Sequence, residues 1–487
     1  MDIRVRYAPS PTGLQHIGGI RTALFDYFYA RSKNGKFILR VEDTDRERFD
    51  PRSLQDIYDT FAWLGIEWDE GPDKGGDFGP YIQTERKKIY AQYISKLIES
   101  GSAYKCFTTA EELDILRKEQ TEAGKSVGYD RRHRNLTEEE IKEYENAGRK
   151  PVIRFKVPLD GTTAFNDAIL GVISKANADL SPDPVLLKTD GFPTYNFANV
   201  IDDHLMEISH VFRGQEYVPS TPLYVLIYKA LGWEPPVFCH LPFVVGKDGQ
   251  KLSKRHGATS IIQFRDQGYL PEALINFVML LGWSYDDSRE LFSIKDLEEL
   301  FSLEKVNKAP AVFDYQKLEW FNGMYIREKN DDELYRLVLP YFQKAGLVAD
   351  PPASAEEDTL RQAVPLIKER LKVLSDAPNV AGFLFRRQEN YSPGDLIPKK
   401  GDEETAKTAL RALEDLMGDF FDRTDEENEQ IVRERAKELG IKLGQLLMPL
   451  RVAMTGSNVS PPLFESLRIL GKDEVLTRLR TALSKLS

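Results

Sequence analysis

The chain has 487 residues, of which 41% are hydrophobic and 29% are charged. This balance is typical of a folded globular protein and excludes an intrinsically disordered one. The 66 basic and 77 acidic residues give a net charge of -11, which disfavours non-specific binding to nucleic acid but allows a local basic surface. At about 150 residues per domain, the length predicts about three domains.

The sequence offers no signal for a membrane or for export. The most apolar stretch, residues 273–283, is interrupted by Asn276 and falls short of the roughly 18 to 20 residues that span a bilayer. Asp2 and Arg4 stand where a signal peptide needs an apolar run. Two cysteines, Cys106 and Cys239, are too few for a disulfide framework. We therefore expect a cytoplasmic protein with no membrane partner.

The first part of the chain alternates strand and helix patterns. Residues 3–8 alternate as a strand does, and the loop at 9–13 leads into a helical pattern that ends before Gly35. Residues 36–43 form a second strand pattern, and a helix is expected over residues 53–64. This order predicts a parallel sheet that binds ligands at the carboxyl ends of its strands.

An insertion interrupts this alternation. Residues 75–185 contain a Lys- and Glu-rich stretch at 111–150 and a short strand pattern at 152–157. The alternation resumes at residues 184–188 and continues through further helices and strands to a strand predicted over residues 238–245. The sequence thus predicts an α/β domain with an α+β insertion.

The rest of the chain is predicted to be helical. Helical patterns dominate from about residue 265 and are continuous from about residue 328. Residues 390–404 are rich in proline, glycine and charge and are the best candidate for a linker. The acidic run 425–429 is interpreted as a solvated helix start, and residues 474–486 as a last amphipathic helix.

The turn after the first strand carries the first functional motif. It reads RYAPSPTGLQHIGG over residues 6–19. Glycines let backbone approach a phosphate chain, and the following helix N-terminus offers unpaired N–H groups to an anion. His16 stands where it can donate to a phosphate oxygen as negative charge develops. Pro- and Gly-rich turns are common, so this motif alone does not identify a nucleotide site.

A second motif lies far downstream. Residues 249–257 read GQKLSKRHG and place Lys251, Lys254 and Arg255 within five positions. A basic loop alone is usually solvated surface. Together, however, the two motifs resemble the paired ATP signatures of class I aminoacyl-tRNA synthetases, known as HIGH and KMSKS.

Four separated motifs sharpen the resemblance. They are PSPTG at 9–13, RVEDTD at 40–45, DGFPTYNFAN at 190–199 and KLSKR at 251–255. In this order they resemble the bacterial glutamyl-tRNA synthetases, and the likeness extends over the whole chain. The family fold is a Rossmann-type parallel-sheet catalytic domain with an α+β insertion, followed by all-helical anticodon-binding domains.

The resemblance also implies domain boundaries. The expected segments are a catalytic domain at 1–75 and 186–245, an inserted acceptor-binding domain at 76–185, a stem-contact domain at 246–327, and helical anticodon-binding domains at 328–390 and 391–487. Arg370 matches an arginine that faces the anticodon in the family.

The implied reaction joins ATP and L-glutamate into glutamyl-adenylate and pyrophosphate, and then transfers the glutamyl group to tRNA(Glu). Mg²⁺ is implied on the phosphates. His16, Lys251 and Lys254 would be the catalytic residues. By resemblance, the nucleotide site would comprise Pro9, Ser10, Gly13, His16, Gly18, Gly19, Glu216, Lys251, Leu252, Ser253, Lys254 and Arg255.

Glutamate itself needs two cations and one anion, because it carries two carboxylates and an ammonium group. By resemblance, Arg6 would bind the α-carboxylate, Glu42 the α-ammonium and Arg213 the side-chain carboxylate. The planar fork of arginine can bind a carboxylate bidentately, which lysine cannot do. The polar lining would be completed by Ser10, Tyr195 and Asn199.

The chain departs from its relatives at a possible zinc site. Some relatives bind zinc in the insertion, but here the corresponding positions are Cys106, Thr108, Tyr129 and His133. Only two strong ligands remain where a structural zinc site needs four, so zinc is not expected. Gly19 also replaces the last letter of the bare HIGH motif, a substitution seen in this family.

Three other functions are compatible with parts of this pattern. A glutaminyl-tRNA synthetase shares the catalytic design, but it has β-barrel anticodon domains and no use for a buried cation at Arg213. A truncated homologue that charges a modified tRNA base would lack residues beyond about 330. An inactive tRNA-binding module would have no reason to keep all five of these residues: His16, Lys254, Arg6, Glu42 and Arg213. Whether tRNA(Gln) is also charged stays open. The resemblance implies a monomer, and no obligate protein partner is indicated.

Overall fold

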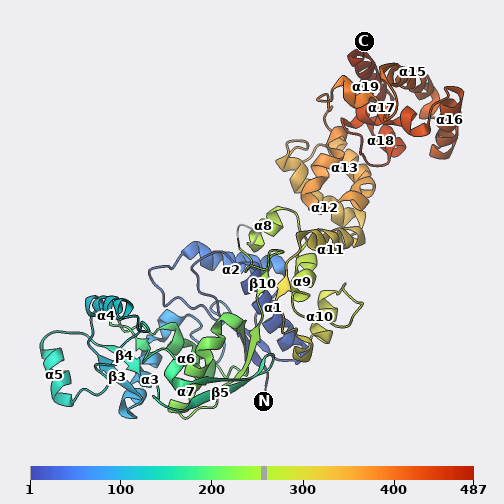
Figure 1. Cartoon of the computed structure of the whole chain (residues 1–487). Helices are drawn as coiled ribbons and strands as arrows, with labels where there is room; N and C mark the ends of the chain where they lie inside the picture. Colours follow the sequence, from blue (N-terminus) through green and yellow to red (C-terminus); the bar gives the residue numbers. More distant parts are fainter. Residues whose placement is uncertain (1, 254–259, 487) are drawn as a thin grey trace. The chain divides into compact units, whose positions relative to one another are not determined.

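The computed structural model describes residues 2–253 and 260–486 (Figure 1). The chain divides into two compact units. The first contains residues up to 264 together with residues 274–314, and the second contains residues 265–273 and those from 315 onward. The first unit mixes strands and helices, and the described part of the second unit is helical, which confirms the predicted fold class.

The first unit begins with the predicted strand, helix and strand. Strand β1 (Arg4–Tyr7) pairs in parallel with β2 (Lys36–Leu39), and α1 (Ile17–Ser32) connects them. Helix α2 (Pro51–Leu64) follows, and its N-terminus is capped by the carboxylate of Asp50. All four residues of β1 are buried, as expected for a parallel strand covered on both faces.

A second parallel pair comes from distant sequence. Strand β8 (His210–Gly214) pairs in parallel with β9 (Val237–Leu241), and α7 (Thr221–Ala230) is the crossover. The backbone N–H of Ser209 donates to the carbonyl of Arg4 at 2.9 Å, which places β8 beside β1. Helix α6 (Tyr195–Leu205) leads into this pair.

The strand predicted over residues 238–245 is divided in the structure. Strand β9 ends before Pro242, because proline has no N–H to continue a ladder. The remaining residues form β10 (Val244–Val245), which pairs in parallel with β11 (Ala311–Val312). This break separates the strand that pairs with β8 from the strand that precedes Lys251.

The insertion forms a small antiparallel sheet with helices. The sheet has the order β3 (Ala103–Cys106), β4 (Val152–Phe155) and β7 (Val185–Leu187). Its helices are α3 (Lys87–Glu99), α4 (Ala110–Glu122) and α5 (Glu138–Asn146).

A hairpin from the insertion returns to the catalytic sheet. Strands β5 (Thr162–Asp167) and β6 (Gly171–Ala176) pair in antiparallel fashion, and the end of β5 pairs in parallel with β9 at Asp167 and Phe238. The resulting sheet has the order β6-β5-β9-β8. One end of the insertion hairpin therefore lies next to the strands that carry candidate site residues.

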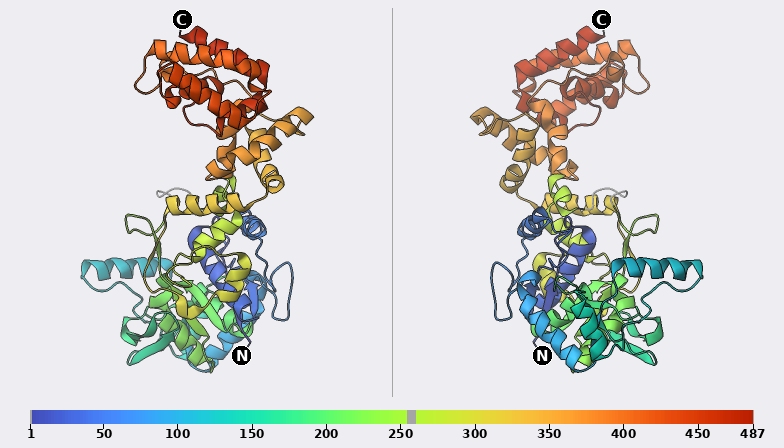
Figure 2. Two further views of the ribbon diagram at one scale, coloured as in Figure 1. Left: turned by 90° about the vertical axis from the view of Figure 1, so that its right-hand side faces the viewer. Right: turned by 90° about the vertical axis from the view of Figure 1, so that its left-hand side faces the viewer.

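The second unit is built from amphipathic helices, drawn from yellow to red in Figure 2. Its longer helices are α11 (Tyr315–Glu328), α12 (Asp331–Lys344), α13 (Ser354–Ile367), α15 (Glu403–Phe420), α16 (Asp425–Glu438), α17 (Leu443–Thr455), α18 (Leu463–Leu470) and α19 (Lys472–Lys485). Shorter helices elsewhere in the chain are α8 (Ile261–Asp266), α9 (Pro271–Met279), α10 (Ile294–Leu300) and α14 (Ala377–Ala381).

Two local predictions in the second unit have different outcomes. The acidic run 425–429 is a helix start, as predicted, with Thr424 Oγ1 accepting the backbone N–H of Glu427. Residues 390–404, by contrast, are not a free linker. Tyr391 and Leu396 are buried in the hydrophobic core of the last helices, because two apolar side chains within this polar stretch find a core to pack against. Among the described helices, none is long and apolar enough to cross a membrane.

Candidate active site

A cavity of about 1330 Å³ lies in the first unit. Its walls come from the loop after β1, the start of α1, the end of β8 and the basic loop. The lining brings together these residues that the sequence singled out: Arg6, Pro9, Ser10, Gly13, His16, Gly18, Gly19, Glu42, Tyr195, Arg213, Glu216, Lys251, Leu252 and Ser253.

Some expected site residues do not line this cavity. Asn199 lies one turn beyond Tyr195 on α6 and is buried beneath the wall, where its amide nitrogen has no hydrogen-bond partner among the described residues. Lys254 and Arg255 lie outside the described residues. Arg370 belongs to the second unit, where it is exposed in the short 3-10 helix Lys368–Arg370.

His16 caps the N-terminus of α1. Its Nδ1 accepts the backbone N–H of Gly19 at 3.2 Å. Partial burial lowers the pKa of His16, and the nearby Lys251 lowers it further. The neutral ring therefore carries its proton on Nε2. This N–H and the helix N-terminus can both donate to a phosphate oxygen in the cavity.

The packing of Tyr7 against the start of α1 explains why position 19 is a glycine. A Cβ atom at this position would lie 2.9 Å from the hydroxyl oxygen of Tyr7. Tyr7 in turn donates to Gln15 Oε1 at 2.5 Å and is buried. A side chain at position 19 would displace this pair, so glycine fits the last position of the motif here.

Arg6 is held by a buried carboxylate. Its Nε donates to Asp203 Oδ1 at 2.9 Å, and its Nη1 donates to the carbonyl of Phe212 at 3.2 Å. Although burial acts to lower it, the pKa of Arg6 is raised because Asp203 lies beside it. Asp203 was not predicted as a partner, since it lies 197 residues away along the chain.

Arg40 links Asp203 to Glu42. Its Nη1 donates to Asp203 Oδ1 at 2.7 Å and its Nη2 donates to Glu42 Oε1 at 2.9 Å. The side chains of Arg40 and Glu42 are 0% and 4% exposed. Burial raises the pKa of Glu42, while Arg40 opposes that rise. The RVEDTD motif indicated Glu42 but gave no sign that Arg40 would bind two carboxylates.

A further arginine extends this network. Arg86 Nε donates to Asp202 Oδ1 at 2.7 Å, and Tyr90 donates to Asp202 Oδ2 at 2.8 Å. Three arginines and three carboxylates thus form one buried group around one side of the cavity: Arg6, Arg40, Arg86, Glu42, Asp202 and Asp203. Its formal charges cancel.

Arg213 has a different environment. Its Nε donates to His240 Nε2 at 3.0 Å, and its Nη2 donates to Thr221 Oγ1 at 2.8 Å. The guanidinium carbon lies 4.7 Å from the ring centre of Tyr224 and 5.1 Å from that of Phe238. Among the described residues, no carboxylate pairs with Arg213 and no hydrogen bond uses its Nη1. This 6% exposed cation lines the cavity without an anion.

An ion pair joins Lys251 of the basic loop to Glu216, in the 3-10 helix Gln215–Ser220 that follows β8. Lys251 Nζ lies 3.2 Å from Glu216 Oε1, and both side chains are largely exposed. The two residues were predicted to contact different parts of a nucleotide. In the structure they contact each other, so a bound phosphate would compete with Glu216 for Lys251.

The four positions that correspond to the zinc ligands of some relatives form a hydrogen-bonded cluster. The thiol of Cys106 lies 3.3 Å from both the Tyr129 hydroxyl and Arg154 Nε, and Nδ1 of His133 accepts the backbone N–H of Phe107 at 3.1 Å. Within the described ranges, no three or more His, Cys, Asp or Glu side chains are grouped so that they could hold a metal ion.

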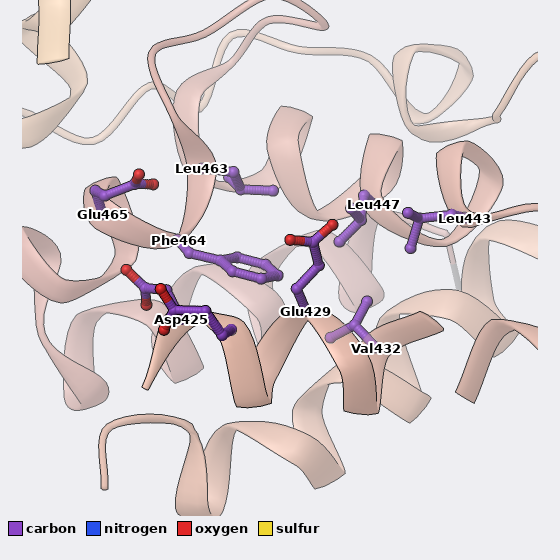
Figure 3. A pocket seen from close by; sticks show the side chains of 9 residues that line it. Asp425, Glu429, Val432, Leu443, Leu447, Leu463, Phe464 and Glu465 are labelled. Atoms are coloured by element: carbon purple, nitrogen blue, oxygen red, sulfur yellow. The ribbon is translucent and has the colours of Figure 1, made fainter. Parts of the chain in front are cut away.

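A second pocket, of about 300 Å³, lies among α16, α17 and α18 (Figure 3). Figure 3 shows the carboxylates of Asp425, Glu429 and Glu465 around apolar side chains such as Phe464 and Leu447. Negative charge at this pocket disfavours phosphate, so it does not compete with the first cavity as a nucleotide site.

Two family models match the chain. Residues 2–320 match the family model described as "tRNA synthetases class I (E and Q), catalytic domain", and residues 333–483 match the model described as "Anticodon binding domain".

Individual relatives align over nearly all of the chain. The glutamate–tRNA ligase of Borreliella burgdorferi is 53% identical over 482 residues, which are 99% of this chain and 98% of the relative. That of Treponema denticola is 51% identical and covers 100% of both chains. The crystal structure of a glutamate tRNA ligase from Elizabethkingia meningosepticum, in complex with its amino acid, is 37% identical, covers 100% of both chains and has a TM-score of 0.86. The chain therefore belongs to the class I tRNA synthetase (E and Q) family.

Proposed function

We propose that this chain is a glutamate–tRNA ligase, which joins L-glutamate to tRNA(Glu) through a glutamyl-adenylate and releases AMP and pyrophosphate. The observation that carries this proposal is Arg213, a buried cation that has no anionic partner among the described residues and lines the same cavity as the His16 motif. Its family and the names of its relatives support the same activity.

In the first step, an oxygen of the glutamate α-carboxylate attacks the α-phosphorus of ATP. The bond to the β-phosphate breaks, and pyrophosphate leaves with the electron pair. The residues need not form a covalent intermediate, because positioning and charge stabilisation are the main contributions in phosphoryl transfer. The Nε2–H of His16 and the N-terminus of α1 stabilise the developing negative charge.

The basic loop supplies further cations. Lys251 leaves its ion pair with Glu216 to bind a phosphate, and Glu216 is then free to contact the ribose or adenine. Lys254 and Arg255 would add their charges from the same loop, as their motif suggests. Mg²⁺ carried on the phosphates neutralises charge when bound. Such an ion often needs few protein ligands, because phosphate oxygens and waters complete its coordination.

Glutamate lies with its side-chain carboxylate on Arg213. The α-carboxylate faces Arg6 and the ammonium group faces Glu42, with Ser10 and Tyr195 beside them. Arg6 is already paired with Asp203, so it adds to α-carboxylate binding through its remaining N–H groups. Asn199, one turn from Tyr195, supports this lining from below.

Arg213 also explains selection against glutamine. A neutral amide would leave the buried guanidinium without an anion, and breaking a buried ion pair costs about 3 to 5 kcal/mol. This free energy corresponds to roughly 10² to 10³ or more in discrimination. A site made for glutamine would have no use for this cation, so the rival glutaminyl specificity is disfavoured.

The remaining segments bind tRNA in this proposal. Residues 76–185 contact the acceptor end, residues 246–327 the inner stem, and the helical segments 328–390 and 391–487 the anticodon arm. Arg370 is exposed, and its charge adds to the burial that lowers the pKa of Arg451, so two cations lie near each other on this helical surface. Exposed arginines of this kind can contact RNA phosphates and stack on unpaired bases.

The direct test is amino-acid-dependent exchange of labelled pyrophosphate into ATP, measured with tRNA(Glu) present. We expect exchange with L-glutamate, and at least about 100-fold weaker kcat/KM with L-glutamine, from the unpaired guanidinium argument above. Equal exchange with both amino acids would contradict the specificity. Absence of exchange with every amino acid would favour an inactive tRNA-binding module.

A further inference from the structure

A fully buried aspartate and histidine stand behind Arg213. His240 Nδ1 lies 2.6 Å from Asp167 Oδ2, and both side chains are 0% exposed. On its other side, His240 Nε2 lies 3.0 Å from Arg213 Nε. Asp167, His240 and Arg213 therefore form a continuous chain of hydrogen bonds that ends at the cavity wall.

The donor in the outer bond fixes the protonation of the ring. An arginine Nε–H can only donate, so His240 Nε2 must be the acceptor. The ring proton is then on Nδ1, where it donates to the Asp167 carboxylate. Burial lowers the pKa of His240, and the hydrogen bond to Asp167 opposes this shift without reversing it. The ring is therefore neutral.

Asp167 is itself held by backbone. Its Oδ1 accepts the N–H of Ile169 at 3.0 Å and of Leu170 at 2.8 Å in the turn between β5 and β6. Its Oδ2 also accepts the N–H of His240 at 3.1 Å. These bonds leave the carboxylate one orientation, with Oδ2 directed at the ring. The hairpin of the insertion thus reaches the amino-acid end of the site through one side chain.

The chain determines which edge of Arg213 remains available. Nε is bound by His240, and Nη2 is bound by Thr221, whose hydroxyl proton is donated to the carbonyl of Tyr217 at 2.9 Å. The aromatic rings of Tyr224 and Phe238 lie against the guanidinium. The Nη1 edge is left for a ligand.

We propose that Asp167 and His240 are positioning residues for substrate specificity: Asp167 selects the His240 tautomer that accepts a hydrogen bond from Arg213, and this bond directs the free guanidinium edge toward the side-chain carboxylate of the amino acid. This inference rests on the proposed role of Arg213 in binding glutamate. It adds two residues that touch no substrate.

The sharpest variant is Asp167→Asn. The Asn oxygen can still accept the two turn N–H groups, but its NH₂ group then faces His240 Nδ1. The ring can accept from this NH₂ group only if its proton moves to Nε2, and it can then no longer accept from Arg213 Nε, so the bond to Arg213 is lost, as in other buried carboxylate–histidine pairs. We expect KM for glutamate to rise about 10- to 100-fold, the range for loss of one buried hydrogen bond. KM for ATP should change less than about twofold.

Two substitutions of His240 separate the hydrogen bond from the packing. In His240→Gln, the amide oxygen can still accept from Arg213 Nε, whereas His240→Phe keeps a ring between Phe165 and Phe238 without an acceptor. We expect His240→Phe to lose glutamate affinity and His240→Gln to recover most of it. His204→Phe is the matched control, because His204 stacks on Trp233 and does not line the cavity.

The protonated nitrogen of His240 can also be identified in the wild-type protein. The chain has 6 histidines, so ¹⁵N-labelling of histidine and long-range ¹H–¹⁵N NMR can assign the protonated nitrogen of each ring. His240 should be protonated on Nδ1 only, and its signal should disappear in His240→Gln. A ring protonated on Nε2, or on both nitrogens at pH 7, would overturn the proposal.

The kinetic outcomes also separate this inference from the proposed function. If the wild-type chain activates glutamate and Asp167→Asn and His240→Phe leave KM for glutamate unchanged, the positioning role is wrong and the ligase function stands. If wild type activates no glutamate, the proposed function itself fails. Equal rises in KM for glutamate and for ATP would indicate a general structural role and also overturn the inference.

Discussion

Arg6 and Arg213 both line the cavity and are both buried, but they differ in the charge of their side-chain partners. Arg6 belongs to a network in which three guanidinium groups meet three carboxylates. Arg213 is equally buried, but its side-chain partners are the neutral His240 and Thr221. The charge of Arg6 is therefore compensated by carboxylates of the fold, whereas Arg213 has no carboxylate partner among the described residues and can pair with an anion from solution.

Substitutions of these two arginines should therefore have different effects. Removing one member of a compensated network leaves another buried charge unpaired, which destabilises the folded state. Removing Arg213 leaves no carboxylate unpaired within the described residues, so its loss should appear in substrate binding. The four predictions that follow separate these effects, from the largest to the smallest.

The strongest effect on folding is expected for Arg40→Met. This change leaves Glu42 and Asp203 without their shared guanidinium, at positions that are 4% and 6% exposed. The free energy of unfolding should fall by about 3 to 5 kcal/mol. Urea unfolding at pH 7 measures this change. A loss below about 1 kcal/mol, the size typical of an exposed pair, would show that the network is not a stabilising unit.

Arg213→Met should instead act on the substrate. We expect kcat/KM for glutamate to fall roughly 10² to 10³-fold and the preference over glutamine to disappear, since the change removes a buried cation that has no carboxylate partner among the described residues. The midpoint of urea unfolding should stay near that of wild type. Retained discrimination between the two amino acids would place specificity elsewhere.

A third arginine site tests carboxylate pairing in the second unit. Glu474 accepts from Arg387 at 2.6 Å and from Arg478 at 2.8 Å, and the Arg387 bond is the main reason that the pKa of Glu474 is lowered to about 2. The folded pKa lies below the ordinary value, so the pair stabilises the protein above about pH 4.5 and this contribution is lost as pH falls toward about 2.

The measurement is urea unfolding of wild type and Glu474→Gln between pH 7 and pH 2.5. The advantage of wild type should be constant above about pH 5 and shrink progressively below about pH 4.5. Glu404→Gln is the control, because this exposed glutamate has no ion pair among the described residues. An advantage that does not depend on pH would mean that pairing is not its source.

The smallest effect is expected at the exposed pair of Glu216 and Lys251. Their side chains are 44% and 64% exposed, and exposed pairs contribute about 0 to 1 kcal/mol to stability. Glu216→Gln should therefore leave the unfolding midpoint nearly unchanged while KM for ATP changes. A large loss of stability without any change in KM for ATP would reverse the assignment of Glu216 to the nucleotide side.

The sequence predicted the residues that line the cavity better than the buried residues that hold them in place. Arg6, His16 and Arg213 lie in motifs whose local pattern can be recognised along the chain, and all three line one cavity. Asp203 and Asp167 could not be predicted, because they meet Arg6 and His240 across 197 and 73 residues through strand pairing and helix packing. The β5 and β6 hairpin looked like part of the insertion, although the register of β5 on β9 brings Asp167 to the site.

Single residues also made two segment boundaries difficult to predict from the sequence. Pro242 ends β9 where the apolar pattern continues, and Tyr391 and Leu396 anchor a stretch whose overall composition indicates a linker. In both cases one or two residues with a specific backbone or packing requirement outweighed the average of the surrounding segment.

The most direct test of this account is a crystal structure of the full chain with bound L-glutamate. The account predicts the side-chain carboxylate at hydrogen-bond distance from Arg213 Nη1, with Arg213 Nε still on His240 Nε2 and His240 Nδ1 on Asp167. A glutamate whose side-chain carboxylate binds another cation, or an Arg213 that has left His240 to face solvent, would contradict it.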